Sequence, residues 1–588
     1  MGISVNSASG TIGDMNLKGS SFIAQDTTGL AITGNVNVES VVNSYENESK
    51  RTNKGFLSSD SRYVNAHEEE NVAGNLQLNG AKIEGNLTGT GSNIVLGENT
   101  FVGGKVTTDS RELHNSYYEK NKNKGFNSGI SHGRASVGYG KSQNTYDEKS
   151  TVNAKSSLQV GDGSVLNRGA EITATNFEYG NIQINNGDVK YGARIDTRDV
   201  HTSSKSSGFT ISAGINSPIK DRIKQAEQAV KQIKNGDTIG GAMEAINVAT
   251  GTVKDMSGNI TRHNGSRATM KDIENGDFKV NNDFYVSGNI NAGFKKSKSS
   301  TDSHTESAAV TTMRPLNENS SITYNNVNNI TYQGTQAQGG TFIYNNVANI
   351  QKEAVELRNR YSSESSGFGV GVSAGIGSNG QIKPNSISGN ISINGGNENT
   401  VETVYVNGIF RNVNEVHNNT GSMTLSGFNQ EGGKVTGNIG KLVVESRQNT
   451  STTTGSSSGI GLGISANGVP SSVNVNGSRT NGSRAFVDNQ SSFIVGEGSN
   501  LHVGTLENTG AVIGKQSDNG TTFKIDTYVG KDIQNHDTMK TTGGSIGIST
   551  GKPRITNVGF NQDSRDKQGI TRNTVVGNVE IQNASGDE

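Results

Sequence analysis

The sequence from residue 321 to residue 350 is SITYNNVNNITYQGTQAQGGTFIYNNVANI, and it contains a short repeat. Tyr324-Asn325-Asn326-Val327 returns 20 residues later as Tyr344-Asn345-Asn346-Val347. A unit this short cannot bury its own apolar face, so it has to stack on copies of itself. Runs of Thr, Val, Ile, Tyr and Phe broken by Asn and Gly favour short strands joined by turns. The repeat therefore predicts rungs of a parallel β-helix.

The asparagines recur at the same place in both copies of the repeat. Stacked asparagines can hydrogen-bond from rung to rung, and asparagine tolerates the left-handed backbone of a tight corner. We therefore expect Tyr324 and Tyr344 to lie one above the other in adjacent rungs. At about 4.8 Å per rung, roughly 20 rungs would make a rod on the order of 100 Å long.

The composition suits an elongated body better than a compact one. The chain has 588 residues, of which 78 are Gly, 5 are Pro and 30% are hydrophobic. Disorder is the alternative interpretation, but disordered chains favour Pro and a high net charge, and the net charge here is -1. The 53 basic and 54 acidic residues create no bulk field that would attract nucleic acid, so we expect no nucleic-acid partner.

The absence of cysteine and the first residues of the chain provide information on the cellular compartment of the protein. The absence of cysteine excludes disulfides and thiolate metal sites. It suits a protein that crosses an oxidising periplasm, and it is equally compatible with the cytosol. No apolar run approaches 18 residues, and the first residues lack both parts of a signal peptide. We expect the sequence to be a piece from inside a longer protein.

A larger module recurs along the chain. A polar, charged excursion begins at Val38-Glu39-Ser40 and ends at Gly55-Phe56, after which strand-like sequence resumes. The Gly-Phe pair that ends this segment recurs at Gly125-Phe126, Gly208-Phe209 and Gly367-Phe368, and as Gly-Ile at Gly459-Ile460. Most of the spacings are roughly 70 to 90 residues, which indicates a module that spans several rungs. We expect β-hairpin or loop excursions from the β-helix.

One segment breaks the β pattern. Residues 217–251 carry a capping serine, a proline at the first helical position and apolar residues at helical spacing, and Asn235-Gly236 separates two such runs. This predicts one inserted αα-hairpin that packs on the rod. The predicted organisation is therefore β-helix rungs with repeat modules at 1–216, the αα-hairpin at 217–251, further modules at 252–514 and a closing β segment at 515–588.

The sequence contains no recognisable catalytic, cofactor or metal motif. Gly138-Tyr139-Gly140-Lys141-Ser142 ends like a phosphate-binding loop, but Ala135 stands where the first glycine is required. A polysaccharide-degrading β-helix enzyme would need carboxylates repeated at rung spacing, and none recur. We expect a protein that is not an enzyme and has no cofactor, with the polysaccharide-degrading enzyme kept as an alternative.

Several motifs in order resemble a known group. They are the charged excursion after Val-Glu-Ser, the alternating strand from Gly367 to Gly377, the segment DTYVGKDIQNHD at 526–537, and Gly569-Ile570-Thr571-Arg572. Together they resemble the haemagglutinin-repeat region of filamentous-haemagglutinin-like two-partner secretion exoproteins, which include contact-dependent growth inhibition effectors. The resemblance covers nearly the whole chain.

The resemblance implies a fold, a location and partners. It implies a right-handed β-helix that is secreted to the cell surface through an outer-membrane transporter, with the export signal in a part not included in this chain. Its partner would be the surface of a target or host cell, and the rod would be monomeric. In the growth inhibition effectors, this region assists delivery of a C-terminal toxin across the target outer membrane. An adhesin stalk without a toxin is the alternative.

Three strands share a two-faced pattern in which apolar residues alternate with Gly or Ser. Their apolar residues are Phe368, Val370, Val372, Ala374 and Ile376 in the first, Ile460, Leu462 and Ile464 in the second, and Phe209 and Ile211 in the third. The first, at 11 residues, has the length that a tilted strand needs to cross a bilayer. We hypothesise that these strands pack on the rod before contact and insert into a membrane afterwards. The alternative is that their apolar face stays buried on the rod.

Overall fold

The computed structural model describes residues 2–131, 134–216, 260–261, 279–280, 287–376, 382–383, 386–550 and 554–587. Most of these residues lie in β-strands, and no α-helix occurs in these ranges. None of the described segments is therefore a helix that could span a membrane. The αα-hairpin predicted at 217–251 lies outside the described residues and finds no support there.

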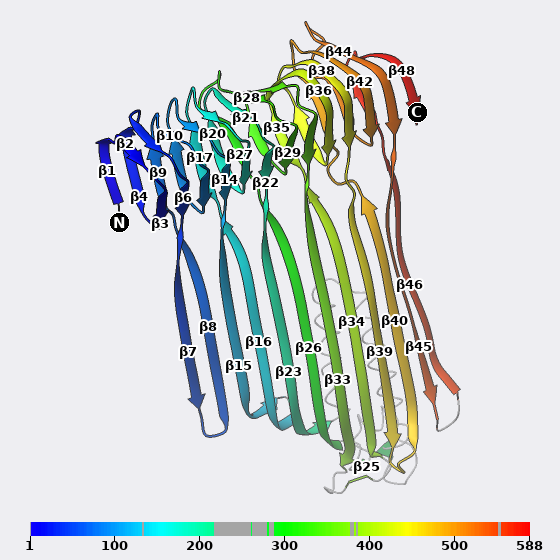
Figure 1. Cartoon of the computed structure of the whole chain (residues 1–588). Helices are drawn as coiled ribbons and strands as arrows, with labels where there is room; N and C mark the ends of the chain where they lie inside the picture. Colours follow the sequence, from blue (N-terminus) through cyan, green and yellow to red (C-terminus); the bar gives the residue numbers. More distant parts are fainter. Residues whose placement is uncertain are drawn as a thin grey trace, which may run out of the picture.

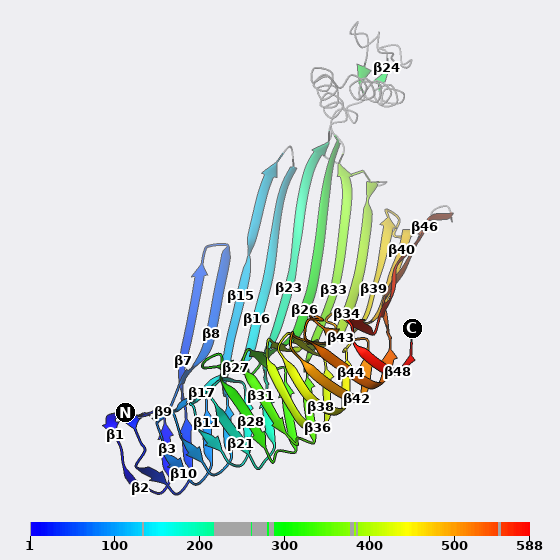
Figure 2. The same ribbon diagram turned by 90° about the horizontal axis from the view of Figure 1, so that it is seen from above.

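Parallel strands stacked rung upon rung form a β-helix that runs the length of the molecule (Figures 1 and 2). One face of the coil is a sheet of thirteen parallel strands. In stacking order these are β1 (Gly2–Ser7), β4 (Ser21–Asp26), β9 (Asn75–Leu78), β12 (Asn93–Leu96), β17 (Ser156–Val160), β20 (Thr175–Tyr179), β27 (Thr312–Pro315), β30 (Gln336–Gln338), β35 (Gly408–Arg411), β37 (Phe428–Glu431), β41 (Ser492–Val495), β43 (Val512–Lys515) and β47 (Thr574–Val576).

The second sheet, of 21 strands, covers the other two faces of the coil. One stack contains β2 (Gly10–Ile12), β5 (Leu30–Ile32), β10 (Lys82–Ile83), β13 (Phe101–Val102), β18 (Val165–Leu166), β21 (Ile182–Asn185), β28 (Ser321–Asn325) and β31 (Thr341–Asn345). The other contains β3 (Met15–Lys18), β6 (Val36–Glu39), β11 (Leu87–Thr90), β14 (Val106–Asp109), β19 (Ala170–Thr173), β22 (Val189–Gly192), β29 (Asn329–Gln333) and β32 (Asn349–Glu353). Longer strands then continue both stacks: β36 (Asn414–Ser426), β38 (Val435–Glu445), β42 (Asn500–Thr509), β44 (Thr522–Lys531) and β48 (Glu580–Gly586).

The predicted register of the repeat is confirmed. Tyr324 of β28 lies opposite Tyr344 of β31 in adjacent parallel strands. Their rings are stacked with centroids 5.4 Å apart and an interplanar angle of 10°. The Asn345 side-chain amide donates to the Asn325 side-chain oxygen at 2.8 Å, which is the expected amide ladder. Asn346 has the expected left-handed backbone, with φ of 54°.

The rod is shorter than predicted. Thirteen strands stack in the first sheet, rather than roughly 20 rungs. The residues that the coil does not use form long hairpins, because each polar, charged excursion of the sequence is a pair of extended strands. The coil interior itself is continuous, since buried apolar side chains of successive rungs form one cluster from Leu30 to Tyr528.

Six antiparallel hairpins leave the rod and run side by side (Figure 1). Each begins where a strand of the second sheet ends and returns where a strand of the thirteen-stranded sheet begins, so all six leave from the same corner of the coil. The hairpins are β7–β8 (Val41–Lys54, Ser58–Val72), β15–β16 (Arg111–Ser131, Arg134–Ala154), β23–β26 (Arg194–Asn216, Ser287–Ala309), β33–β34 (Val355–Ile376, Ser388–Val406), β39–β40 (Asn449–Ser465, Pro470–Phe486) and β45–β46 (Ile533–Ser549, Arg554–Thr571). A separate short pair, β24 (Ile260–Thr261) and β25 (Lys279–Val280), lies between β23 and β26 in the sequence.

The hairpins occur in every second rung from the first hairpin onward. Successive rungs are about 4.8 Å apart, and so are hydrogen-bonded strands within a sheet. A two-stranded hairpin therefore occupies the width of two rungs. Neighbouring hairpins meet at hydrogen-bonding distance, and the six form one twelve-stranded antiparallel sheet in the order β7, β8, β15, β16, β23, β26, β33, β34, β39, β40, β45, β46. We call this the hairpin sheet.

In the rungs without a hairpin, the same corner is a tight turn with a left-handed residue. These corner residues are Gly19, Gly91, Ala174, Gly334, Gly427 and Gly510. At Gly334, φ is +60° and an added Cβ would lie 2.4 Å from Cγ2 of Val355, the first residue of a hairpin strand. Glycine at this corner both permits the turn and leaves room for the base of the neighbouring hairpin.

Substitutions at two of these corner residues test the requirement for glycine. We expect Gly334→Ala to lower the free energy of unfolding by about 1–3 kcal/mol, because it adds both backbone strain and a clash with Val355. Ala174 already has φ of 44° at the equivalent corner, so Ala174→Gly should leave stability unchanged or raise it by up to about 1 kcal/mol. Urea unfolding of the two variants makes the comparison. Equal destabilisation by both would contradict the role of the corner.

Candidate functional site

The hairpin sheet extends away from the rod as a single layer (Figure 2). Its strands form ladder hydrogen bonds only with one another. Many of its large apolar side chains are exposed, including Val372 at 50% and Phe209 at 42%. The expectation that these strands pack on the rod is therefore wrong for the described residues.

One face of the outer half of the sheet is apolar across ten strands. Residues directly opposite each other in neighbouring strands project from the same face of a sheet. One such cross-strand row consists entirely of apolar or aromatic residues: Phe126, Tyr139, Phe209, Phe294, Val370, Ile391, Leu462, Val473, Ile548 and Ile555. We call the side that carries this row the apolar face.

The opposite side carries small and polar residues. The adjacent row lies one residue along each strand, or two in β46, where the register shifts. It is Gly125, Gly140, Gly208, Lys295, Gly369, Ser392, Gly461, Asn474, Gly547 and Asn557. Shallow depressions on this part of the sheet include one of about 740 Å³ bordered by Gly208, Gly369 and Ser392. We call this side the small-residue face. The sheet therefore separates two chemically different surfaces with only one backbone layer between them.

The structure brings the predicted membrane strands onto this one face. Phe209, Val370 and Leu462 belong to the same cross-strand row. The next row outward contains Ile211, Val372 and Ile464, and the next row inward contains Phe368 and Ile460. Ala374 lies in the row beyond Val372, and the backbone of Ile376 pairs with that of Gly288.

Sequence reasoning identified three of the ten strands of the apolar face and missed the other seven. The overlooked contributors lie in β15, β16, β26, β34, β40, β45 and β46. Two of these strands carry a signal that could have identified them, because Ser545-Ile546-Gly547-Ile548 and Ser392-Ile393 show the same alternation of apolar and small residues. The recurring Gly-Phe pairs also lie within hairpin strands or their turns. Phe126 is in β15, whereas Phe56 is in the turn of the first hairpin and is fully exposed.

The inner part of the apolar side carries paired histidines and carboxylates. His304 Nδ1 lies 2.6 Å from Asp199 Oδ1, and its Nε2 lies 3.0 Å from Glu306 Oε1. His201 Nδ1 lies 2.5 Å from Asp302 Oδ1 in the neighbouring cross-strand pair. Hydrogen bonds to Glu306 and Asp199 raise the pKa of His304. In the described ranges, no group of three or more such side chains is arranged to hold a metal ion.

The raised pKa of His304 predicts pH-dependent stability. A histidine whose pKa is higher in the folded than in the unfolded state stabilises the fold fully below its unfolded pKa of about 6.5 and loses that contribution as pH rises through the folded value. We expect unfolding midpoints to fall between about pH 6 and pH 8, and His304→Gln to flatten that slope. His114→Gln, at a 61% exposed side chain, is the control. An unchanged slope in His304→Gln would contradict this assignment.

Inside the rod, a chain of buried hydroxyls ends on an ion pair. Tyr324 and Tyr332 hydroxyls lie 3.3 Å apart, and those of Tyr332 and Tyr344 lie 2.9 Å apart. Tyr344 donates to Glu415 Oε2 at 3.0 Å, and Lys352 Nζ donates to the same oxygen at 2.7 Å. All of these side chains are fully buried. The network satisfies polar atoms that would otherwise be costly to bury.

The ion pair fixes the charges of its members. Burial alone would raise the pKa of Glu415, but the Lys352 ammonium and the His417 ring outweigh it and hold the pKa well below the usual range of a glutamate. Burial lowers the pKa of Lys352, while Glu415 opposes this effect. The Gln430 side chain accepts from Lys352 at 2.5 Å. Glu415 is therefore ionised at neutral pH and depends on Lys352.

Removing one charge of this pair should destabilise the fold more than removing both. Lys352→Met leaves a buried carboxylate without its counter-ion, and we expect the free energy of unfolding to fall by about 3–5 kcal/mol. The double variant Lys352→Met, Glu415→Leu removes both charges and should recover at least half of that loss. Urea unfolding of the wild type, both single variants and the double variant measures the coupling. Additive effects of the two substitutions would show that the pair is not coupled.

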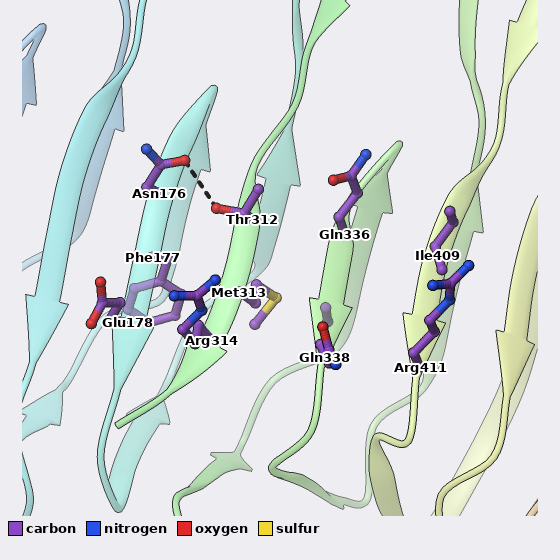
Figure 3. A pocket seen from close by; sticks show the side chains of 11 residues that line it. Asn176, Phe177, Glu178, Thr312, Met313, Arg314, Gln336, Gln338, Ile409 and Arg411 are labelled. Atoms are coloured by element: carbon purple, nitrogen blue, oxygen red, sulfur yellow. Dashed lines mark hydrogen bonds between the residues drawn. The ribbon is translucent and has the colours of Figure 1, made fainter. Parts of the chain in front are cut away.

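A groove of about 560 Å³ lies on the outer face of the thirteen-stranded sheet, across β20, β27, β30 and β35 (Figure 3). Glu178 lies opposite Arg314, and Gln338 lies opposite Arg411. The lining includes a single carboxylate, that of Glu178. Glycoside hydrolysis usually requires two carboxylates on either side of the bond that is cleaved. This groove therefore gives no support to the polysaccharide-degrading alternative.

The rod and its sheet define the class of the protein: an all-β parallel solenoid that carries a single-layer sheet of hairpins. Residues 292–460 match the family model of the Hemagglutinin repeat, so this part of the chain is a hemagglutinin-repeat region. The match confirms the resemblance to a haemagglutinin-repeat region. It extends from β26 through β33 and β34 into β39. Proteins of this family are typically secreted or displayed at the cell surface. No curated protein matches the chain.

Proposed function

We propose that this chain is part of a secreted surface exoprotein and that the apolar face of its hairpin sheet engages the membrane of another cell. In this role the sheet assists passage of a C-terminal toxin across the target outer membrane. The observation that carries the proposal is the cross-strand row of ten apolar residues on a sheet of one layer. A surface of this kind marks an interaction site, because soluble proteins rarely leave large continuous apolar areas in water.

The dimensions of the sheet support a membrane partner. Phe368, Val370, Val372 and Ala374 lie in successive rows of one face of β33. A transmembrane strand needs roughly 9–11 residues, and the alternating segment of β33 has this length. Neighbouring strands of the sheet are paired through the apolar region, with register shifts only at Gly463/Ile464 and Gly547/Ile548 in the described strands, and such pairing is what the hydrocarbon region requires of a backbone. Glycine and serine on the small-residue face provide the polar side that such a sheet would turn away from lipid.

The remaining parts of the proposal rest on the family and on general rules of topology. The rod coils right-handed, as nearly all parallel β-connections do. It acts by surface contact, without catalysis or a cofactor, and it is a monomer exported through an outer-membrane transporter. Its partner is a cell surface and not nucleic acid. If the sheet does not enter membranes, the adhesin stalk without a toxin is the function that remains.

Charged substitutions on the apolar face test the proposal. We expect the purified chain to float with phosphatidylcholine vesicles, and Val370→Asp with Leu462→Asp to weaken this binding at least about 100-fold, because each lipid-facing carboxylate is costly near the bilayer centre. The matched control is Ser392→Asp with Asn474→Asp, which adds the same charge in the same region of the small-residue face.

The controls make the outcomes distinct. Circular dichroism must show the same β content for all three proteins. The proposal is wrong if the folded Val370→Asp, Leu462→Asp variant binds vesicles as the wild type does, or if the control variant loses binding equally. In the parent exoprotein, the same pair of substitutions should abolish inhibition of target cells while leaving attachment intact, and attachment alone without inhibition in the wild type would favour the adhesin.

A further inference from the structure

Lysines gather on the apolar side of the sheet, directly inward of the apolar row. Lys124, Lys141 and Lys296 occupy the next cross-strand row in the N-terminal hairpins. Lys122, Lys205 and Lys298 occupy the row after that. Residues at two-residue spacing along a strand project from one face, so these lysines share the side of Phe126 and Phe294. We call them the lysine band.

The lysine band surrounds a depression that contains no acid. The depression measures about 670 Å³ and is bordered by seven lysines, the six of the band and Lys50, together with Ser, Thr, Asn and Gln side chains. In the part of the chain that the structure describes, none of these lysines forms an ion pair. The nearby carboxylate of Asp60 pairs with Asn53 on the other side of the sheet. A group of ammonium groups without counter-ions favours a polyanionic partner.

The position of the band selects among polyanions. The whole chain has a net charge of -1, so the positive field is local and not a property of the molecule. The band borders the apolar row on the same side, where a sheet that enters a bilayer crosses from hydrocarbon to headgroups. Lysine at that depth keeps its ammonium at the headgroup level while its methylenes cover apolar surface. A soluble polyanion would have no use for the adjoining apolar row.

We infer that the lysine band binds the phosphates of anionic lipid headgroups in the membrane that the apolar face enters. This inference rests on the proposed function and adds the chemistry of the lipid to it. The band lies only in the N-terminal hairpins, because Phe368, Ile393, Ile460, Val475, Ile546 and Val558 continue the row of Lys296 in the C-terminal ones. The headgroups are therefore bound at one end of the sheet, and the apolar area is taller at the other end.

Vesicles of defined charge test the inference. We expect the wild type to bind vesicles of phosphatidylcholine with phosphatidylglycerol more tightly than phosphatidylcholine alone. Lys122→Gln, Lys205→Gln and Lys298→Gln together should reduce this preference by about 100-fold, since each lysine near an anionic surface contributes about fivefold. The control is Lys18→Gln, Lys190→Gln and Lys531→Gln, three exposed lysines of the rod that change the net charge equally.

The outcomes separate this inference from the proposed function. Equal binding of the wild type and the triple variant to anionic vesicles overturns the inference, even if Val370→Asp with Leu462→Asp still abolishes binding to neutral vesicles. Salt-sensitive binding to anionic vesicles that needs the lysine band but not Val370 and Leu462 supports the band and contradicts insertion. Competition by a DNA duplex or dextran sulfate that removes wild-type binding, with no preference between the two vesicles, overturns the inference in favour of a soluble polyanion.

Discussion

The architecture depends on one shared length, the distance between hydrogen-bonded β-strands. Rungs of the coil and strands of a sheet repeat at about 4.8 Å. Because hairpins occur in alternate rungs, their twelve strands have the same spacing as the rungs that carry them. Rod and sheet can therefore extend together without strain. A hairpin in every rung would crowd the sheet, and a hairpin in every third rung would leave gaps in its hydrogen bonding.

In the described residues, the hairpin sheet has only a small buried apolar cluster at its base, around Val355 and Leu357, so its order comes from this base and from its ladders. Each hairpin starts directly after a rung, and the corner between hairpins places Gly334 against Val355 at the base of the next one. Within the rod, Lys352 and Glu415 join neighbouring rungs through a buried ion pair. Errors of register in the rod would be passed to the sheet, which explains why a specific polar network inside the coil has a value beyond its modest net stability.

The repeat around Tyr324 was sufficient to predict the rod, because both the stacking of Tyr344 and the asparagine ladder follow from a period of one rung. The inner halves of the hairpins could not be predicted as strands. In β7 and β15 both faces meet water, so charged residues such as Lys50 and Lys122 stand where an alternating apolar pattern would otherwise mark a strand. The outer halves were predictable in part, since Val370 and Leu462 alternate with glycine. The sequence could not predict that these strands form one continuous apolar face, because this depends on the occurrence of hairpins in alternate rungs.

The first and last strands of the hairpin sheet have no neighbour beyond them. Open edges of a flat, apolar sheet invite pairing with other chains and lead to aggregation. Here β7 carries Glu46, Glu48, Lys50 and Arg51, and β46 carries Asp563, Arg565 and Asp566. Bringing two such edges together would place charged side chains against one another along the new ladder. The charged borders thus oppose fibre growth along the inner part of the sheet, next to the rod. Beyond Gly125, where β8 no longer pairs with β15, the edge of the apolar face is the uncharged end of β15.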